Sequence, residues 1–378
     1  MTTILTNALL VLPNEVALGT IVLEDGFIVD VQPGRRSSAP SAVDLGGDTL
    51  MPGVVDVHTD NLERQVQPRS NARWPSRSAM VAHDAQCAAA GVTTVLDALC
   101  LGDLGFDKDR VLTFRDGVAD LDALADTGLL KSEHFLHLRC ELPAPDMMDL
   151  LDPVAEHPRV RMVSLMDHSP GVGQYANLDR YRKMRVREGH ASAWIEGRIL
   201  ELQDQRARTR SPNRRLLLAR IVPLGIVLAS HDDNTAEEVA ENAADGIRIS
   251  EFPVSMLAAS EARAHGMDVI AGAPNIVRGG SHSGNVAAAD LVRRGVVDAY
   301  ASDYVPSSML EAAFASVAQT GISLAQGIAM VTANPARMAG LHDRGRIEAG
   351  LRADLVHVRE HEGMPVVRQV WRGGERVA

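Results

Sequence analysis

The stretch GVVDVHTDNL, residues 53–62, begins as an apolar, β-branched run and ends in polar side chains. Its first half is typical of a buried strand, whereas His58 and Asp60 stand where that strand should leave the core. Alternate residues of a strand point to the same side, so His58 and Asp60 share one face. An imidazole and a carboxylate on one face at a strand end indicate a polar site there.

Similar strand-like runs recur along the chain, separated by stretches of helical period. With 54–60 they cover residues 93–99, 134–142, 159–168, 226–232, 246–253, 268–274 and 297–303. Alternating strands and helices predict a parallel sheet, and eight units over about 290 residues fit a closed (β/α)8 barrel of the α/β class. An open doubly wound sheet is the alternative. Residues 180–215 form a charged helical insertion, which is either a solvated helix or a lid over the barrel mouth.

The two ends of the chain differ from this central part. Both are rich in short strand-like pieces, such as TTILTNALLVL near the start and VVRQVWRGGERVA at the end. This shared β character predicts a small β-sandwich domain built from residues 1–50 and 345–378. The catalytic barrel would then comprise residues 51–344.

Composition narrows the classes of function. The chain has 378 residues, 46% of them apolar, and a formal net charge of -11, which argues against a nucleic-acid surface. Its three cysteines lack paired spacing, so we expect free thiols in a reducing cytoplasm. No stretch approaches roughly 18 apolar residues, and the start lacks the features of a signal peptide. We expect a cytoplasmic protein outside the membrane, and whether its copies form a homo-oligomer stays open.

Residue types that bind metals recur where the predicted strands end. They are His58 and Asp60 on the first run, Glu141 on the third, His168 on the fourth, His231 on the fifth and Asp303 on the eighth. Barrel enzymes collect catalytic groups at the carboxyl ends of their strands. Buried polar groups need partners, and one cation supplies several. Imidazoles and carboxylates suit Zn²⁺, Mn²⁺, Fe²⁺ or Ni²⁺, so we expect one or two divalent ions, zinc first.

These features resemble the amidohydrolase superfamily of metal-dependent barrels. The resemblance rests on a strand ending in HxD after PG, on later histidines that close strands, on an aspartate after the last strand and on GRIEAGLRADLV near the end. In that superfamily a β-sandwich from both termini flanks the barrel, and many members bridge two metals with a carbamylated lysine. The lysines here, Lys108, Lys131 and Lys183, close no predicted strand, so the resemblance implies Glu141 as the substitute. The strand count places His168 and His231 one strand earlier than is usual in the superfamily.

Longer stretches resemble the branch of the superfamily that serves phosphonate metabolism by the carbon–phosphorus lyase route. They include MPGVVDVHTDNLERQVQPR, HLRCELP, VSLMDHSPGVGQYAN and SDYVPSSMLEAAF. That branch hydrolyses α-D-ribose 1-methylphosphonate 5-triphosphate to the 5-phosphate and pyrophosphate. The resemblance implies a diphosphatase that acts on a phosphorylated ribose, with Asp303 accepting a proton from the attacking water. Hydrolysis of a C–N bond in a cyclic amide or amine is the alternative reaction, and a metal-bearing scaffold without turnover is the alternative class.

Cationic and donor residues are available to hold a triphosphate. Arg278, Ser281 and His282 lie in the loop NIVRGGSHSGN after the seventh run, where barrels often bind phosphate. Arg139 faces inward on the third run, and a buried arginine needs an anionic ligand or a carboxylate. His83, on the helix after the first run, is a substrate contact by resemblance.

Overall fold

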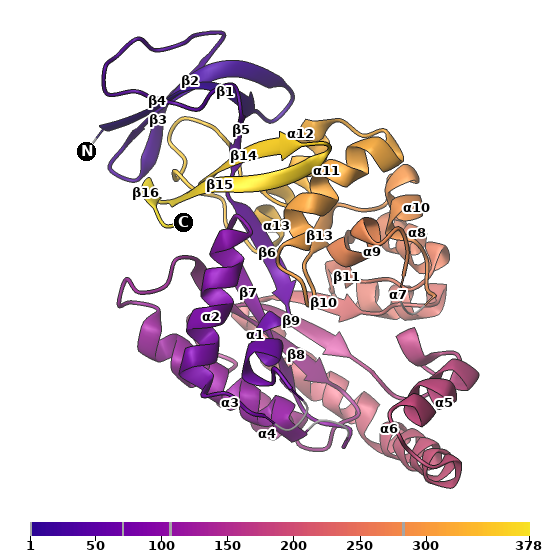
Figure 1. Ribbon diagram of the computed structural model, residues 1–378. Coiled ribbons are helices and arrows are strands. Elements are labelled where there is room, and N and C mark those ends of the chain that lie inside the picture. Colours follow the sequence, from indigo (N-terminus) through magenta and orange to yellow (C-terminus); the bar gives the residue numbers. More distant parts are fainter. Residues whose placement is uncertain (1, 70–71, 106–107, 282–283) are drawn as a thin grey trace.

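The computed structural model describes residues 2–69, 72–105, 108–281 and 284–378, and its strands form two sheets (Figure 1). One sheet is parallel and has eight strands that are neighbours in chain order. These are β6 (Val54–Thr59), β7 (Val92–Leu101), β8 (Glu133–Glu141), β9 (Val160–Met166), β10 (Val227–His231), β11 (Ile249–Glu251), β12 (Asp268–Gly272) and β13 (Ala299–Ala301). Each predicted run overlaps one of them, so the count of eight is confirmed.

The last strand returns to the first. Thr59 and Asp303 form a parallel bridge, the Asp303 amide donates to the His58 carbonyl at 3.0 Å, and the Asp60 amide donates to the Asp303 carbonyl at 2.5 Å. The sheet is therefore a nearly closed (β/α)8 barrel, and the open doubly wound alternative is wrong. Its interior below the mouth is largely apolar, with Val55 and Ile249 among the side chains that fill it.

Helices cover the outside of the barrel in the connections between strands. The longer ones are α2 (Ser76–Ala89), α3 (Lys108–Leu124), α7 (Ala236–Ala244), α8 (Met256–Ala264) and α11 (Ser308–Thr320). The shorter ones are α1 (Asn61–Val66), α4 (Met147–Leu151), α9 (Ala273–Val277), α10 (Ala288–Arg293), α12 (Leu324–Ala329) and α13 (Ala333–Met338). Capping residues define where two of these helices begin. Thr235 and Glu238 form a capping box at α7, and Ser255 caps α8.

The second sheet joins both ends of the chain, and both termini lie beside it in Figure 1. Its strands are β1 (Thr2–Val11), β2 (Val16–Glu24), β3 (Phe27–Pro33), β4 (Val43–Asp44), β5 (Thr49–Pro52), β14 (Leu355–His361), β15 (Met364–Arg372) and β16 (Glu375–Arg376). β5 pairs in parallel with β1 and antiparallel with β14, which links the two ends. The predicted β unit from both termini is confirmed, whereas its boundaries at residues 50 and 345 stay predictions.

The charged insertion between β9 and β10 consists of α5 (Leu178–Arg187) and α6 (Ser192–Ile221), which Figure 1 shows reaching out from the barrel. The later part of α6 packs on the barrel, where the Asn213 amide donates to the carbonyls of Leu142 and Ala144 at 2.9 Å. Among the described helices, none combines the length and the apolar content that crossing a bilayer requires.

One glycine after α13 is required by both backbone angle and space. Gly345 has a φ of +87°, and a Cβ there would lie 2.9 Å from Ala333 Cα and 3.0 Å from the Thr332 carbonyl oxygen. Gly350 has a similar φ of +90° but no heavy atom within 4 Å of its Cβ position. We expect Gly345→Ala to lower the free energy of unfolding by about 3 kcal/mol or more, and Gly350→Ala by about 1–2 kcal/mol. Chemical denaturation of both variants measures the difference, and equal losses would show that the close approach is unimportant.

Candidate metal centre and its pocket

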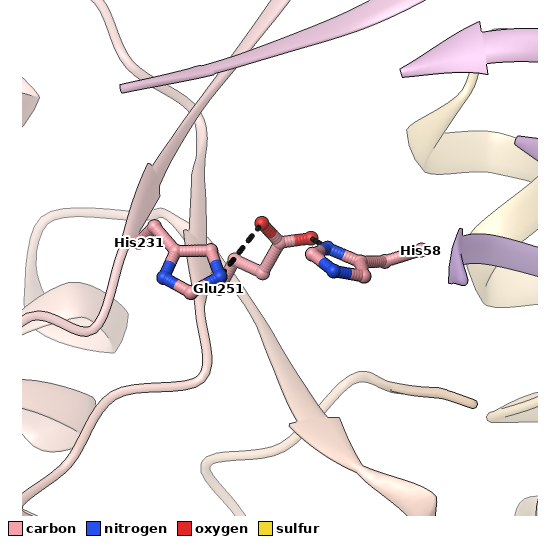
Figure 2. Close-up of side chains that lie close together, drawn as sticks. All are labelled: His58, His231 and Glu251. Atoms are coloured by element: carbon pink, nitrogen blue, oxygen red, sulfur yellow. Dashed lines mark hydrogen bonds and ion pairs between the residues drawn. The ribbon is translucent and has the colours of Figure 1, made fainter. Parts of the chain in front are cut away.

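Side chains from six barrel strands meet at the carboxyl-end mouth. Its centre is the buried carboxylate of Glu251, at the end of β11. His58 Nδ1 lies 2.8 Å from Glu251 Oε1, and His231 Nε2 lies 3.9 Å from Glu251 Oε2. Figure 2 shows the carboxylate between the two rings with one oxygen toward each. Strands β6, β10 and β11 therefore deliver two imidazoles and a carboxylate to one point.

Further ligand-type atoms surround this trio. His168 Nε2 lies 3.8 Å from Asp232 Oδ2, and that oxygen lies 3.3 Å from His231 Nδ1. On the other side, His58 Nε2 lies 3.5 Å from Asp60 Oδ1. Overlapping groups, each with its ligand atoms within 4.8 Å of one another, connect His58, Asp60, His168, His231, Asp232, Glu251 and Asp303. We call these residues the polar centre.

The polar centre contains buried atoms that lack hydrogen-bond partners within the described residues. They are His58 Nε2, His231 Nδ1, Asp232 Oδ2 and Glu251 Oε2. An unsatisfied buried polar atom destabilises a fold by about 1–3 kcal/mol, so four together need an explanation. A divalent cation would satisfy several of them at once, and mixed imidazole and carboxylate donors are what such cations bind. The residues present therefore fit a metal site.

The backbone is unusual at the same strand ends. Asp232, Phe252 and Asp303 have φ values of 59°, 54° and 56°. This left-handed conformation is uncommon for residues other than glycine and costs about 1–3 kcal/mol where the side chain is bulky. It bends the chain directly after His231 and Glu251, so these two side chains stay at the mouth while the chain turns away.

Mutual attraction sets the charges of His58 and Glu251. Burial favours neutral His58, but the negative charge of Glu251 outweighs burial and raises the pKa of His58 to about 10. Burial likewise favours neutral Glu251, yet the attraction of His58 lowers the pKa of Glu251 to about 2. Burial, followed by repulsion from Asp60, raises the pKa of Asp303 to about 7. Asp303 can thus exchange a proton near neutral pH.

Two predicted residues are engaged by protein partners in the structure. Arg139 Nη1 donates to both oxygens of Asp60, at 2.7 and 2.8 Å, so the buried guanidinium has its carboxylate. Glu141 accepts from the amide and the Nδ1 of His168, at 2.8 and 2.6 Å, and so fixes that ring. Carboxylates commonly orient histidine ligands in this way. Metal binding by Glu141 and substrate binding by Arg139 stay predictions.

His137 is buried just below the mouth and is satisfied there. Its Nδ1 lies 3.0 Å from the Val57 carbonyl, and its Nε2 lies 3.0 Å from Ser164 Oγ. Burial lowers the pKa of His137 to about 3, so the ring is neutral and can donate to the carbonyl and accept from the hydroxyl. This histidine supports the site without lining the pocket.

His83 lies outside the pocket. Its Nδ1 accepts from the Asn61 amide at 2.9 Å, and its Nε2 donates to Asp97 at 2.7 Å. The other Asp97 oxygen lies 2.8 Å from His134 Nδ1, and His134 Nε2 lies 3.2 Å from Asp84. Because both ring nitrogens of His83 have protein partners and the ring is fully buried, its position gives no support to the predicted substrate contact.

The structure brings most predicted site residues to one mouth. His58, Asp60, His168, His231 and Asp303 belong to the polar centre. The predicted substrate contacts Arg139, Arg278 and Ser281 line the pocket, whereas His282 lies outside the described residues. Sequence reasoning omitted Glu251 and Asp232 from the ligand set. Both stand at the carboxyl ends of predicted runs, which is the signal that selected the other residues.

The pocket above the polar centre is a cavity of about 720 Å³. Part of its wall comes from the insertion, where Arg185, Glu188, His190 and Trp194 line it. The His190 and Trp194 rings stack with their centroids 4.1 Å apart. This end of the insertion is therefore more than a solvated helix, because it forms part of the cavity wall.

Comparison with known proteins agrees with this geometry. Residues 188–377 match the amidohydrolase family, and the whole chain has a close curated relative. That relative is the alpha-D-ribose 1-methylphosphonate 5-triphosphate diphosphatase of Escherichia coli K12, which is 42% identical over 99% of this chain and 100% of its own. This chain belongs to the amidohydrolase family.

Solved structures of this family share the fold. N-acetyl-D-glucosamine-6-phosphate deacetylase from Mycobacterium smegmatis superposes with a TM-score of 0.64 at 19% identity, covering 100% of both chains. N-isopropylammelide isopropylaminohydrolase from Burkholderia multivorans gives 0.64 at 18%, covering 100% of this chain and 98% of its own. At such identities the likeness concerns the fold alone.

The network behind the pocket makes stability depend on pH. Burial opposes the charge on His134, but Asp97 and Asp84 outweigh it and raise its pKa to about 9 from an ordinary value of 6.5. The stabilisation is therefore complete below about pH 6.5 and is lost as pH rises through about 9. We expect the wild-type melting temperature to fall more between about pH 6 and pH 9 than that of His134→Asn, by the equivalent of about 1–3 kcal/mol. Thermal unfolding followed by circular dichroism measures both, and parallel pH profiles would contradict the assignment.

Proposed function

We propose that this amidohydrolase-family enzyme is a metal-dependent diphosphatase. It hydrolyses α-D-ribose 1-methylphosphonate 5-triphosphate to the 5-phosphate and pyrophosphate, as a step in phosphonate metabolism. The observation that carries this proposal is the 42% identity, over 99% of this chain and 100% of the relative, to a protein named for that activity. The polar centre and the cationic side chains around the cavity support it with suitable chemistry.

The cation would be held first by His58, His231 and Glu251, whose nitrogens and oxygens converge in the structure. Asp60, His168, Asp232 and Asp303 supply further donors, and Glu141 keeps the His168 ring in place. The donor set suits zinc, with manganese, iron or nickel as alternatives. A bound divalent ion would add positive charge that acidifies the attacking water and stabilises the phosphoryl oxygens.

The chain itself supplies the base and the cationic surroundings. Asp303 lines the cavity, and its pKa, raised to about 7 by burial and by Asp60, lets it accept a proton from water near neutral pH. The water oxygen bonds to the α-phosphorus, and the bond from that phosphorus to the bridging oxygen breaks. Pyrophosphate leaves with the electron pair. Guanidinium groups that line the cavity offset the negative charge that develops.

The state of the cysteines supports a cellular compartment for the enzyme. Cys87, Cys100 and Cys140 are free and buried. Burial raises the pKa of the Cys100 thiol to about 12, so it stays a neutral thiol at neutral pH. Free thiols fit a reducing environment, and we place the enzyme in the cytoplasm on that ground.

Hydrolysis of a C–N bond has weaker support. The amide- and amine-cleaving proteins named above share the fold at 18–19% identity, which carries no information about the substrate. Hydrolysis of the triphosphate is supported by a relative of 42% identity that is named for this activity. We therefore retain one reaction.

Hydrolysis in ¹⁸O-water tests both the reaction and the base. We expect the metal-loaded enzyme to release pyrophosphate from the ribose triphosphate, with the label in the ribose 5-phosphate, because attack falls on the α-phosphorus. Asp303→Asn should lower kcat by about 10²–10⁴-fold, since the proton acceptor is lost. Asp298→Asn, at a carboxylate that instead pairs with Arg263, is the matched control and should keep kcat. Label found only in pyrophosphate would overturn the proposed site of attack.

A further inference from the structure

The arginines that line the cavity differ in how their charge is balanced. They are Arg64, Arg110, Arg139, Arg185 and Arg278. Three have carboxylate partners within ion-pair distance: Arg110 with Glu63 at 3.1 Å, Arg139 with Asp60 at 2.7 Å and Arg185 with Glu188 at 2.8 Å. Among the residues that the structure describes, no carboxylate pairs with Arg64 or Arg278. Within that part of the chain, these two are the arginines of the cavity wall without a carboxylate partner.

Both groups contact the same residue, Tyr304, at different oxygen atoms. Arg64, on α1 after β6, donates from Nη1 to the Tyr304 carbonyl at 2.7 Å. Arg278, directly after α9, has its Nη1 3.5 Å from the Tyr304 hydroxyl. Both partners are neutral oxygens, so neither contact cancels the charge. Two unbalanced cations beside one tyrosine are expected to attract a polyanion.

This pair of arginines lies next to the polar centre. Tyr304 directly follows Asp303, and Arg64 lies four residues after Asp60, which directly precedes α1. Residues four apart on a helix lie on the same side, so Arg64 extends from the same side of α1 as Asp60. Another part of the wall, from the insertion, carries stacked His190 and Trp194 and the ion pair of Arg185 and Glu188. The cavity wall thus includes two arginines without a carboxylate partner among the described residues and an aromatic pair from the insertion.

We propose that Arg64 and Arg278 form the subsite for the β- and γ-phosphates, which leave as pyrophosphate. The inference rests on the proposed diphosphatase function and specifies how the substrate lies. Guanidinium forks match phosphate oxygens, and the pyrophosphate gains negative charge as its bond to the α-phosphorus breaks. The ribose then extends toward the wall that the insertion provides.

Calorimetric binding of inorganic pyrophosphate to the metal-loaded enzyme tests the subsite directly. We expect Arg64→Ala and Arg278→Ala each to weaken binding about 10-fold or more, and the double variant to weaken it further. Arg64→Lys should fall between, because lysine keeps the charge but loses the fork. Arg294→Ala is the matched control, an exposed arginine outside the cavity, and should bind as the wild type does. Metal content measured after each titration separates a lost subsite from a lost cation.

The results of these measurements test the proposed subsite separately from the proposed reaction. Wild-type affinity for pyrophosphate in the double variant, with metal retained, would overturn the subsite whether or not the enzyme turns over the triphosphate. Weakened binding in the variants supports the subsite even if the wild type releases no pyrophosphate, a result that would refute only the diphosphatase. In the kinetic assay, the same variants should raise the inhibition constant for pyrophosphate and leave that for ribose 5-phosphate unchanged.

Discussion

Two backbone hydrogen bonds between the first and last barrel strands set the positions on which the site depends. The Asp303 amide donates to the His58 carbonyl, and the Asp60 amide donates to the Asp303 carbonyl. They bring the carboxyl ends of β6 and β13 together and so close the ring of strands. Side chains that are far apart in the sequence, such as His58 and Glu251, can share one mouth only because this ring closes.

Because the ring closes, many charged side chains lie together at the mouth, directly above the largely apolar barrel interior. Beneath the mouth, small and branched side chains such as Val57 and Ala301 fill the barrel. Above them, imidazoles and carboxylates lie buried within a few ångströms of one another. Separating any of these groups from its partner would leave a buried charge exposed to a low dielectric, which is costly. The ion pair of His58 with Glu251 and that of Arg139 with Asp60 reduce this cost, and a cation would satisfy the atoms that remain unpaired.

The sequence predicts the barrel well because buried parallel strands leave a strong local signal. All eight apolar runs become strands, and the rule that polar groups gather at their carboxyl ends selects most of the polar centre. Glu251 was not predicted because it lies inside the run 246–253, whereas the strand itself ends at Glu251. The structure gives no support to the prediction for His83, because a helix position does not reveal which partner a buried ring meets, and Asp97 comes from another element. The sequence likewise does not reveal that Arg185 has a carboxylate partner whereas none pairs with Arg64 among the described residues, since this depends on which carboxylates lie near in space.

Anomalous diffraction from crystals of the zinc-loaded protein, recorded at the zinc absorption edge, tests the central claim most directly. The account predicts a peak within coordination distance of His58, His231 and Glu251 at the carboxyl-end mouth. A mouth without a peak, or a peak instead beside the buried network of His83, Asp97 and His134, would contradict it.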